Sequence, residues 1–99
     1  MKAVPPFPPV LEDLAIVVDE HLPAERVEEV IRTSGGSIVT QVNLFDLYRG
    51  AQAGEGKKSL AYSLTYQSAE RTLTDEDVAK IRGKIIRKLE KELNAKLRS

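Results

Sequence analysis

The sequence predicts a two-layer α+β fold in which two helices cover one face of an antiparallel sheet. Three observations lead to this prediction. Segments with strand and helix periodicity follow one another in the order strand, helix, strand, strand, helix, short strand. The chain has 99 residues, enough for one small hydrophobic core. It contains no Cys, which excludes disulfides and thiolate metal ligands.

The first strand and the first helix are predicted from residues 11–36. Residues 11–19 alternate in character, which indicates a strand with one buried face. The side chains expected on that face are Leu14, Ile16 and Val18. A short helix should follow, because Pro23 suits the first helical position and Gly35 and Gly36 provide a stop. Its apolar stripe consists of Val27, Val30 and Ile31.

Two strands are predicted in the middle of the chain. In residues 38–49, Phe45 and Leu47 share a parity opposite to that of Val42 and Leu44, so we expect a bulge or burial on both faces. Residues 59–66 alternate more regularly. The large side chains expected in the core are Leu60, Tyr62, Leu64 and Tyr66. The turn before this strand contains Gly54, Gly56, Lys57 and Lys58.

A second, longer helix should begin after Thr74. Thr74 is expected as the N-cap, residues 75–77 place three acids at the positive end of the helix dipole, and Leu73 and Val78 form a hydrophobic staple. The apolar stripe is Val78, Ile81, Ile85, Leu89 and Leu93. Asn94 should end the helix, and residues 95–98 form a short strand. The complete order, βαββαβ, is that of the ferredoxin-like fold.

The domain organisation is predicted to be simple. Residues 1–10 hold four of the five prolines and should form an extended lead-in, typical of a domain junction in a longer protein. Residues 11–99 form the folded domain. The longest apolar run, residues 14–18, is far shorter than the ~20 residues of a membrane span, and no signal peptide is evident. The sequence therefore predicts a soluble protein.

The net charge of zero conceals a gradient along the chain. Residues 1–56 carry four basic and nine acidic residues, a net −5, and residues 57–77 carry three and four, a net −1. Residues 78–99 carry eight basic and two acidic residues, a net +6. Such a basic end either attracts a polyanion or is a solvated helix face, and charge alone favours neither.

The sheet face not covered by helices is the candidate binding surface. Its expected residues are small: Ala15, Val17, Ser59, Ala61, Ser63 and Thr65. Tyr48, if its parity is opposite to that of Leu47, adds one large aromatic ring that could stack on an unpaired base. Lys57 and Lys58 could contact phosphates. The alternatives are a tyrosine packed over the sheet rim and a solvated hairpin end.

Other chemistries find little support in the sequence. His21, the one histidine, is interpreted as a turn residue, so neither a Ser-His triad nor a histidine metal site is expected. The acids Glu12 and Asp13 flank a strand start, and residues 75–77 serve the helix N-terminus. The Gly-rich turn lacks the spacing of a P-loop, and the signature of RNA-recognition modules is absent. We therefore predict no catalytic residue and no metal ligand.

Five segments carry a resemblance to a known family: FPPV, EDLAIVVDE, LFDLYRG, GEGKKSLAYSLTY and RTLTDEDV. Over residues 7–98 the chain closely resembles the C-terminal ferredoxin-fold anticodon-binding domain of the bacterial phenylalanyl-tRNA synthetase β subunit. The resemblance implies a cytoplasmic module that holds the anticodon stem-loop of tRNA(Phe). Its partners would be the rest of the β subunit and the α subunit of an α2β2 enzyme. ATP and magnesium would act in distant domains, with no cofactor in this one.

The resemblance also implies roles for single residues. Tyr48 and Ser59 would lie on the anticodon-contacting surface, with Arg49, Lys57 and Lys58 as backbone contacts beside them. Two positions depart from the family pattern. Glu12 stands where members usually have Arg, so a basic contact there is lost or supplied elsewhere, and Asn94 stands where Gly is common. Two other functions remain open, a ferredoxin-like regulatory domain that binds a small amino acid and a structural docking domain.

Overall fold

The structure is a computed structural model, and it describes residues 7–49 and 54–98. The elements follow the predicted order, with a 3₁₀ turn in addition. They are β1 (Val10–Asp19), α1 (Ala24–Gly35), η1 (Gly36–Ile38), β2 (Val39–Arg49), β3 (Lys57–Tyr66), α2 (Asp75–Leu93) and β4 (Lys96–Leu97). Most of the predicted lead-in, residues 1–6, lies outside the described residues. Its last residue, Val10, already belongs to β1.

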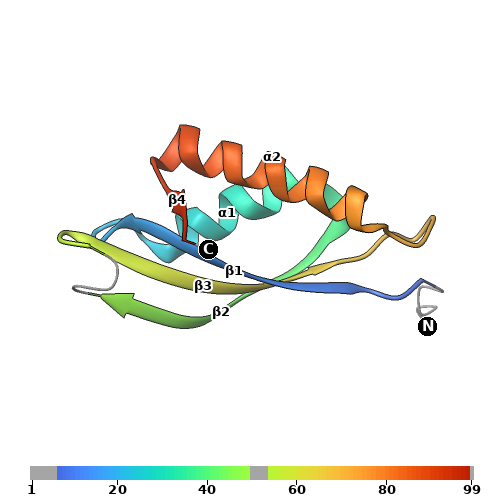
Figure 1. Ribbon diagram of the computed structural model, residues 1–99, viewed down its shortest axis with the longest axis horizontal. Helices are drawn as coiled ribbons and strands as arrows, with labels where there is room; N and C mark the ends of the chain where they lie inside the picture. The colour runs from blue at the N-terminus through green and yellow to red at the C-terminus, as the bar shows by residue number, and fades with distance from the viewer. Residues whose placement is uncertain (1–6, 50–53, 99) are drawn as a thin grey trace.

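The four strands form one antiparallel sheet in the order β2-β3-β1-β4. Both helices lie on one side of this sheet, and no helix of the described residues covers the other side (Figure 1). This arrangement confirms the predicted ferredoxin-like α+β fold. We call the uncovered side the open face and the opposite one the helix side.

The core lies between the helices and the sheet. The strand residues predicted for it are all buried, as are Val27, Val30 and Ile31 of α1. Tyr62 and Tyr66 belong to this core and use their hydroxyl groups there. Tyr62 Oη donates to the carbonyl of Ala24 at 3.1 Å, and Tyr66 Oη donates to Glu12 at 3.0 Å. Burial raises the pKa of both phenols well above the ordinary value, so both stay neutral.

The irregular pattern of residues 38–49 results from a β-bulge. The register of β2 against β3 shifts between Leu44 and Asp46, which leaves Phe45 as the extra residue. Leu44 pairs with Tyr62 and Leu47 pairs with Leu60, so both leucines lie on the helix side. Because of the bulge, the apolar residues of β2 on both sides of it point to the helix side. A bulge was one of the two explanations that the sequence pattern allowed.

The first helix begins one residue later than predicted. Pro23 has an extended backbone, with φ −64° and ψ 139°, and is the N-cap of α1 without a side-chain cap. Its carbonyl accepts the N–H of Arg26 at 3.1 Å. The predicted stop is confirmed, because α1 ends at Gly35 and Gly36 adopts a positive φ of 67°.

The ends of α2 agree with the sequence. Thr74 and Asp77 form a reciprocal capping box, with hydrogen bonds of 3.0 and 3.1 Å. Leu73 and Val78, the predicted staple, are both buried in the core. Asn94 ends the helix in the left-handed conformation, at φ 53°, and leads directly into β4. Within the described residues, neither helix is long and apolar enough to cross a membrane.

Candidate nucleic-acid interface

The strand register arranges the open face in rows that cross the sheet. The first row is Tyr48, Ser59, Val17 and Lys96, from β2, β3, β1 and β4 in turn. The second row is Asp46, Ala61 and Ala15, and the N–H of Arg98 donates to the carbonyl of Ala15 at 2.7 Å. The third is Asn43, Ser63 and Asp13. The small residues predicted for this face thus lie together, with larger polar groups around them.

Tyr48 is the aromatic residue at the β2 end of the first row. Its side chain is 40% exposed, and its hydroxyl donates to Oδ2 of Asp46 at 2.5 Å. Residues two apart on a strand share a face, so the carboxylate of Asp46 lies beside the ring on the open face. This hydrogen bond raises the pKa of Tyr48, which keeps the phenol neutral. The ring is therefore oriented by a carboxylate that has further acceptor capacity.

Ser59 is the neighbour of Tyr48 on β3. Its side chain is fully buried. Among the buried side-chain nitrogen and oxygen atoms of the described residues, its Oγ is the only one without a hydrogen-bond partner. Burying an unpaired hydroxyl costs about 1–3 kcal/mol, and such groups call for an explanation. The main-chain row places this hydroxyl on the open face, between Tyr48 and Val17. A ligand that reached it would satisfy the missing hydrogen bond.

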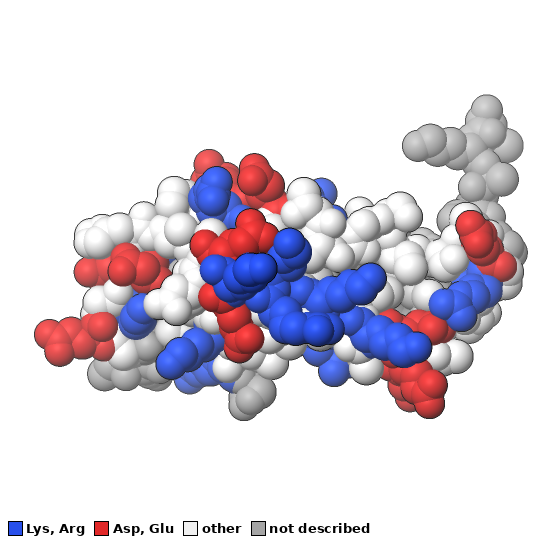
Figure 2. Space-filling view, turned by 90° about the horizontal axis from the view of Figure 1, so that it is seen from above, with Lys and Arg blue, Asp and Glu red and all other residues white. Residues whose placement is uncertain are grey.

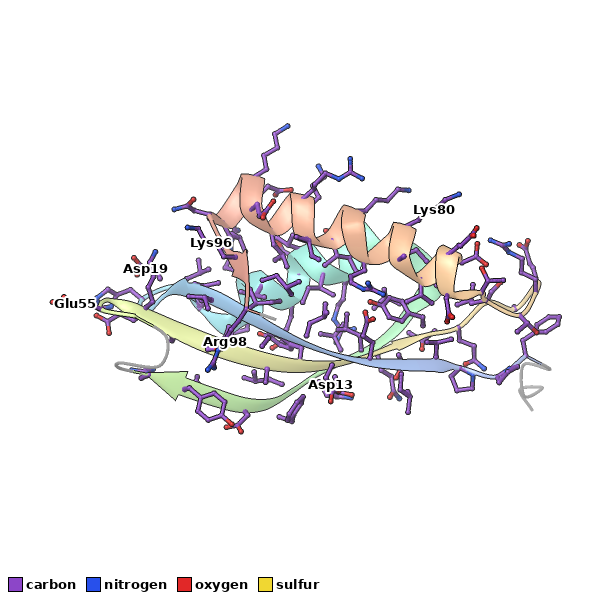
Figure 3. The ribbon with its side chains drawn as sticks, in the orientation of Figure 1. Asp13, Asp19, Glu55, Lys80, Lys96 and Arg98 are labelled. Atoms are coloured by element: carbon purple, nitrogen blue, oxygen red, sulfur yellow. The ribbon has the colours of Figure 1, made fainter. Side chains whose placement is uncertain are left out.

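Basic groups border the same face on the β4 side. A hollow of about 280 Å³ is lined by Asp13, Leu14, Ala15, Phe45, Ala61 and Arg98. A second hollow of about 320 Å³ is lined by Val17, Lys57, Asn94 and Lys96. Asp13 and Arg98 both point to the side of the sheet away from the helices (Figure 3). The face thus carries the carboxylates of Asp46 on β2 and Asp13 on β1, and its cations come from β3 (Lys57) and from the β4 segment (Lys96 and Arg98).

Two of the predicted basic contacts do not lie on this face. Lys58 pairs with Val18 and with Arg49. It precedes Ser59 by one residue on β3, so its side chain points to the helix side while that of Ser59 points to the open face. Lys58 is only 6% exposed. The expectation that Arg49 and Lys58 lie beside Tyr48 and Ser59 on one surface is therefore wrong, because successive side chains of a strand point to opposite faces. Lys57 does lie on the open face.

Glu12 also lies on the helix side, although the family resemblance predicted a basic contact at its position. Its carboxylate accepts hydrogen bonds from Arg82 Nε at 3.1 Å and from Tyr66, and Arg82 Nη2 lies 2.9 Å from Oε2. Glu12, which stands where the family pattern has Arg, thus forms an ion pair with Arg82 that links β1 to α2. This departure from the pattern removes nothing from the open face.

His21 and the acids of residues 75–77, which the sequence analysis assigned to a turn and to a helix start, lie in such positions in the structure. His21 is highly exposed in the turn after β1, where its N–H donates to Asp19 Oδ1 at 2.9 Å. The acids of residues 75–77 lie in the first turn of α2. Within the described residues, no three His, Cys, Asp or Glu side chains gather into a group that could hold a metal ion.

Several residues of the open face were not among those predicted from the sequence, and Phe45, Asp46, Lys96 and Arg98 are the ones that matter most for its chemistry. Phe45 and Asp46 depend on the bulge, whose position the alternation pattern did not fix. Lys96 and Arg98 depend on how β4 pairs with β1. The available signal was the motif FDLY, in which an acid stands two residues before the tyrosine and so shares its face.

Comparison with known proteins found a matching family and similar proteins. A model of the family described as "Ferredoxin-fold anticodon binding domain" matches residues 5–98. The chain is 48% identical over 97 residues to the phenylalanine-tRNA ligase beta subunit of Clostridium acetobutylicum, and 50% identical over 97 residues to that of Clostridium tetani. Each match covers 98% of this chain. The chain spans only 12% of the length of these relatives.

Proposed function

We propose that this chain, which belongs to the ferredoxin-fold anticodon binding domain family, holds the anticodon stem-loop of a transfer RNA on its open face. One observation carries the proposal. The hydroxyl of Ser59 is buried without a hydrogen-bond partner, directly beside the exposed ring of Tyr48. An unpaired polar atom next to an aromatic platform is suited to an unstacked base, which offers both a π-face and hydrogen-bonding edges.

In this proposal, the residues of the first two rows that lie near β2 contact the base, and the alanines beside them leave room for the RNA. Tyr48 stacks on the base, and the Asp46 carboxylate accepts a hydrogen bond from an N–H group on the edge of that base. The hydroxyl of Ser59 supplies the second polar contact. Because this hydroxyl is fully buried, the base must displace part of its cover to reach it. Ala61 and Ala15 form a low floor that lets neighbouring nucleotides approach the sheet.

The phosphate backbone is expected to run along the β4 side of the face. Asp46 on β2 repels phosphates, whereas Lys57, Lys96 and Arg98 provide three cations on the side of β1 and β4, where they outnumber the carboxylates of Asp13 and Asp19. Contacts of this kind fix the position of an RNA and make its affinity fall as the salt concentration rises. The bases would therefore point toward β2.

The transfer RNA we propose is tRNA(Phe). The curated relatives are named as phenylalanine-tRNA ligase beta subunits, which supports this choice. We further propose that the chain is one segment of such a ligase in the cytoplasm, together with the rest of the β subunit and the α subunit of an α2β2 assembly. ATP and magnesium would act elsewhere in that enzyme, while this segment positions the RNA.

The test is the affinity of the chain for a labelled tRNA(Phe) anticodon stem-loop, measured at two salt concentrations. Tyr48→Ala should weaken binding by roughly 1–3 kcal/mol, the range for one lost base–aromatic stack. The matched control is Leu47→Ala, because Leu47 is 39% exposed on the same strand but lies on the helix side. Equal affinities for the two variants would overturn the proposal.

Ser59→Ala separates binding from folding. Because the hydroxyl has no partner in the free protein, its removal should leave the free energy of unfolding unchanged or raise it, while stem-loop binding weakens. Titration with phenylalanine tests the regulatory alternative. Saturable binding of the amino acid without binding of the stem-loop would contradict RNA recognition.

A further inference from the structure

A basic groove lies on the helix layer, on the opposite side of the sheet from the open face. It is a hollow of about 510 Å³ between the end of α1 and the second half of α2. Its lining residues are Thr33, Ser34, Lys84, Arg87, Lys88 and Lys91. Figure 2, which looks onto the helices from above, shows Lys and Arg side chains gathered in a continuous patch over this layer.

The cations of the groove are largely uncompensated. Within the described residues, Lys88 alone among the four forms an ion pair, with Glu92 at 3.6 Å. Lys84 and Lys88 stand four residues apart, as do Arg87 and Lys91, a spacing at which like charges destabilise a helix by about 0.2–0.5 kcal/mol per pair. The helix dipole favours Lys91, which lies in the last turn, but its effect does not extend to Lys84.

The polar chemistry of the groove selects an anion with several acceptor atoms. Among the described residues, no acid lines the groove. The hydroxyls of Thr33 and Ser34 donate to backbone carbonyls of α1, so the free donors come from the four cations. From Lys84 to Lys91 the helix rises about 10 Å, a length over which the four cations can meet several successive phosphates of one nucleic-acid strand.

We propose that this groove binds the phosphate backbone of RNA and gives the domain a second RNA-contacting surface. The choice of RNA rests on the proposed function, which already makes the chain an RNA-binding domain. Since the groove and the open face lie on opposite sides of the molecule, they contact different stretches of backbone. The second stretch belongs either to a more distant part of the same transfer RNA or to another RNA molecule.

The experiment measures binding of the 99-residue chain to a short RNA duplex without a loop, by fluorescence anisotropy over a salt series. Lys84→Gln is compared with Lys80→Gln, which removes the same charge from an exposed position of α2 outside the groove. Lys80 points away from the sheet (Figure 3). Lys84→Gln should weaken duplex binding and lower the salt slope by about one, and Lys84→Gln/Lys91→Gln should lower it by about two.

The outcomes separate this proposal from the one for the open face. Equal duplex affinities for Lys84→Gln and Lys80→Gln would overturn the groove as an RNA site. Tighter binding of poly-glutamate than of the duplex at equal charge concentration would overturn it too, and would assign the groove to an acidic protein segment. Stem-loop binding that Tyr48→Ala leaves unchanged would count against the open face alone. A second equivalent of duplex bound to the complex with full-length tRNA would identify a separate RNA as the source.

Discussion

The carboxylate of Glu12 joins three elements through its two partners. It comes from β1, accepts hydrogen bonds from Tyr66 on β3 and from Arg82 on α2, and lies partly shielded from water beside the core. Hydrogen bonds to a charged group are worth about 1.5–3 kcal/mol, more than those between neutral groups. Glu12 therefore contributes to stability, and its position contributes nothing to the open face.

We expect Glu12→Gln to lower the free energy of unfolding by about 1–2 kcal/mol, because Arg82 and Tyr66 lose their charged acceptor. Stem-loop affinity should not change. Urea denaturation and the anisotropy assay check the two parts. The control is Asp13→Asn, which alters the adjacent carboxylate on the open face and should leave stability nearly unchanged. An unaltered urea midpoint for Glu12→Gln would contradict this assignment.

At the scale of elements, the two helices contain glycines with opposite roles. A Cβ at Gly35, where α1 meets β2, would lie 2.2 Å from Cγ2 of Val39. A Cβ at Gly83, in the middle of α2, would meet nothing within 4 Å. Gly35 thus allows a close approach, while none of the described residues comes close enough to require a glycine at position 83.

Substituting each glycine by alanine should therefore change stability in opposite directions. Gly35→Ala should lower the free energy of unfolding by about 1–3 kcal/mol, the usual range for overpacking. Gly83→Ala should raise it by up to about 1 kcal/mol, because alanine favours the helix. Thermal unfolding of the two variants provides the measurement, and a shift of the same sign in both would refute the packing argument.

The capping box of α2 predicts a dependence of stability on pH. The backbone N–H of Thr74, with help from Arg71, lowers the pKa of Asp77 in the folded protein. A carboxylate whose pKa is lower in the folded state stabilises the protein above its unfolded pKa of about 3.9, and this contribution disappears as the pH falls through the folded pKa.

Asp77→Asn should therefore be less stable than the wild type at neutral pH, and the difference should shrink as the pH falls below about 4. Denaturation midpoints over a pH series measure this difference. Thr74→Ala, which removes the other half of the box, should cost about 1 kcal/mol at every pH above that range. A difference for Asp77→Asn that stayed constant into acid would show that its charge is not involved.

At the scale of the whole molecule, one core supports two chemically different faces. Buried residues from β1, β2, β3 and both helices form a single cluster. The open face mixes carboxylates with cations, whereas the outer side of α2 is strongly basic. Neutral total charge thus results from cancellation between faces and says little about either of them.

A single core predicts cooperative unfolding. The chain should unfold in one two-state transition, with equal calorimetric and van't Hoff enthalpies. Tyr48→Ala and Lys84→Gln, which alter exposed side chains on opposite faces, should leave this transition in place. Differential scanning calorimetry provides the measurement, and two separate transitions would be inconsistent with one shared core.

Much of this architecture could be predicted from sequence periodicity. The alternation of residues 59–66 assigns Tyr62 and Tyr66 to the core, and the N-cap at Thr74 and the helix end at Asn94 bound α2. These features could be predicted because each signal arises between residues close in the chain. The predicted start of α1 was wrong by one residue, because proline suits both the N-cap and the first helical position, and Pro23 occupies the N-cap.

The sequence by itself determined the order of elements, the fold class and the small side chains of one sheet face, Ser59 among them. Tertiary structure alone decided which cations join them. The side of a strand residue changes with a register shift of one, so Lys58 is buried on the helix side while Lys96 and Arg98 reach the open face through β4. Pairing between distant strands sets that register, and local sequence does not encode it.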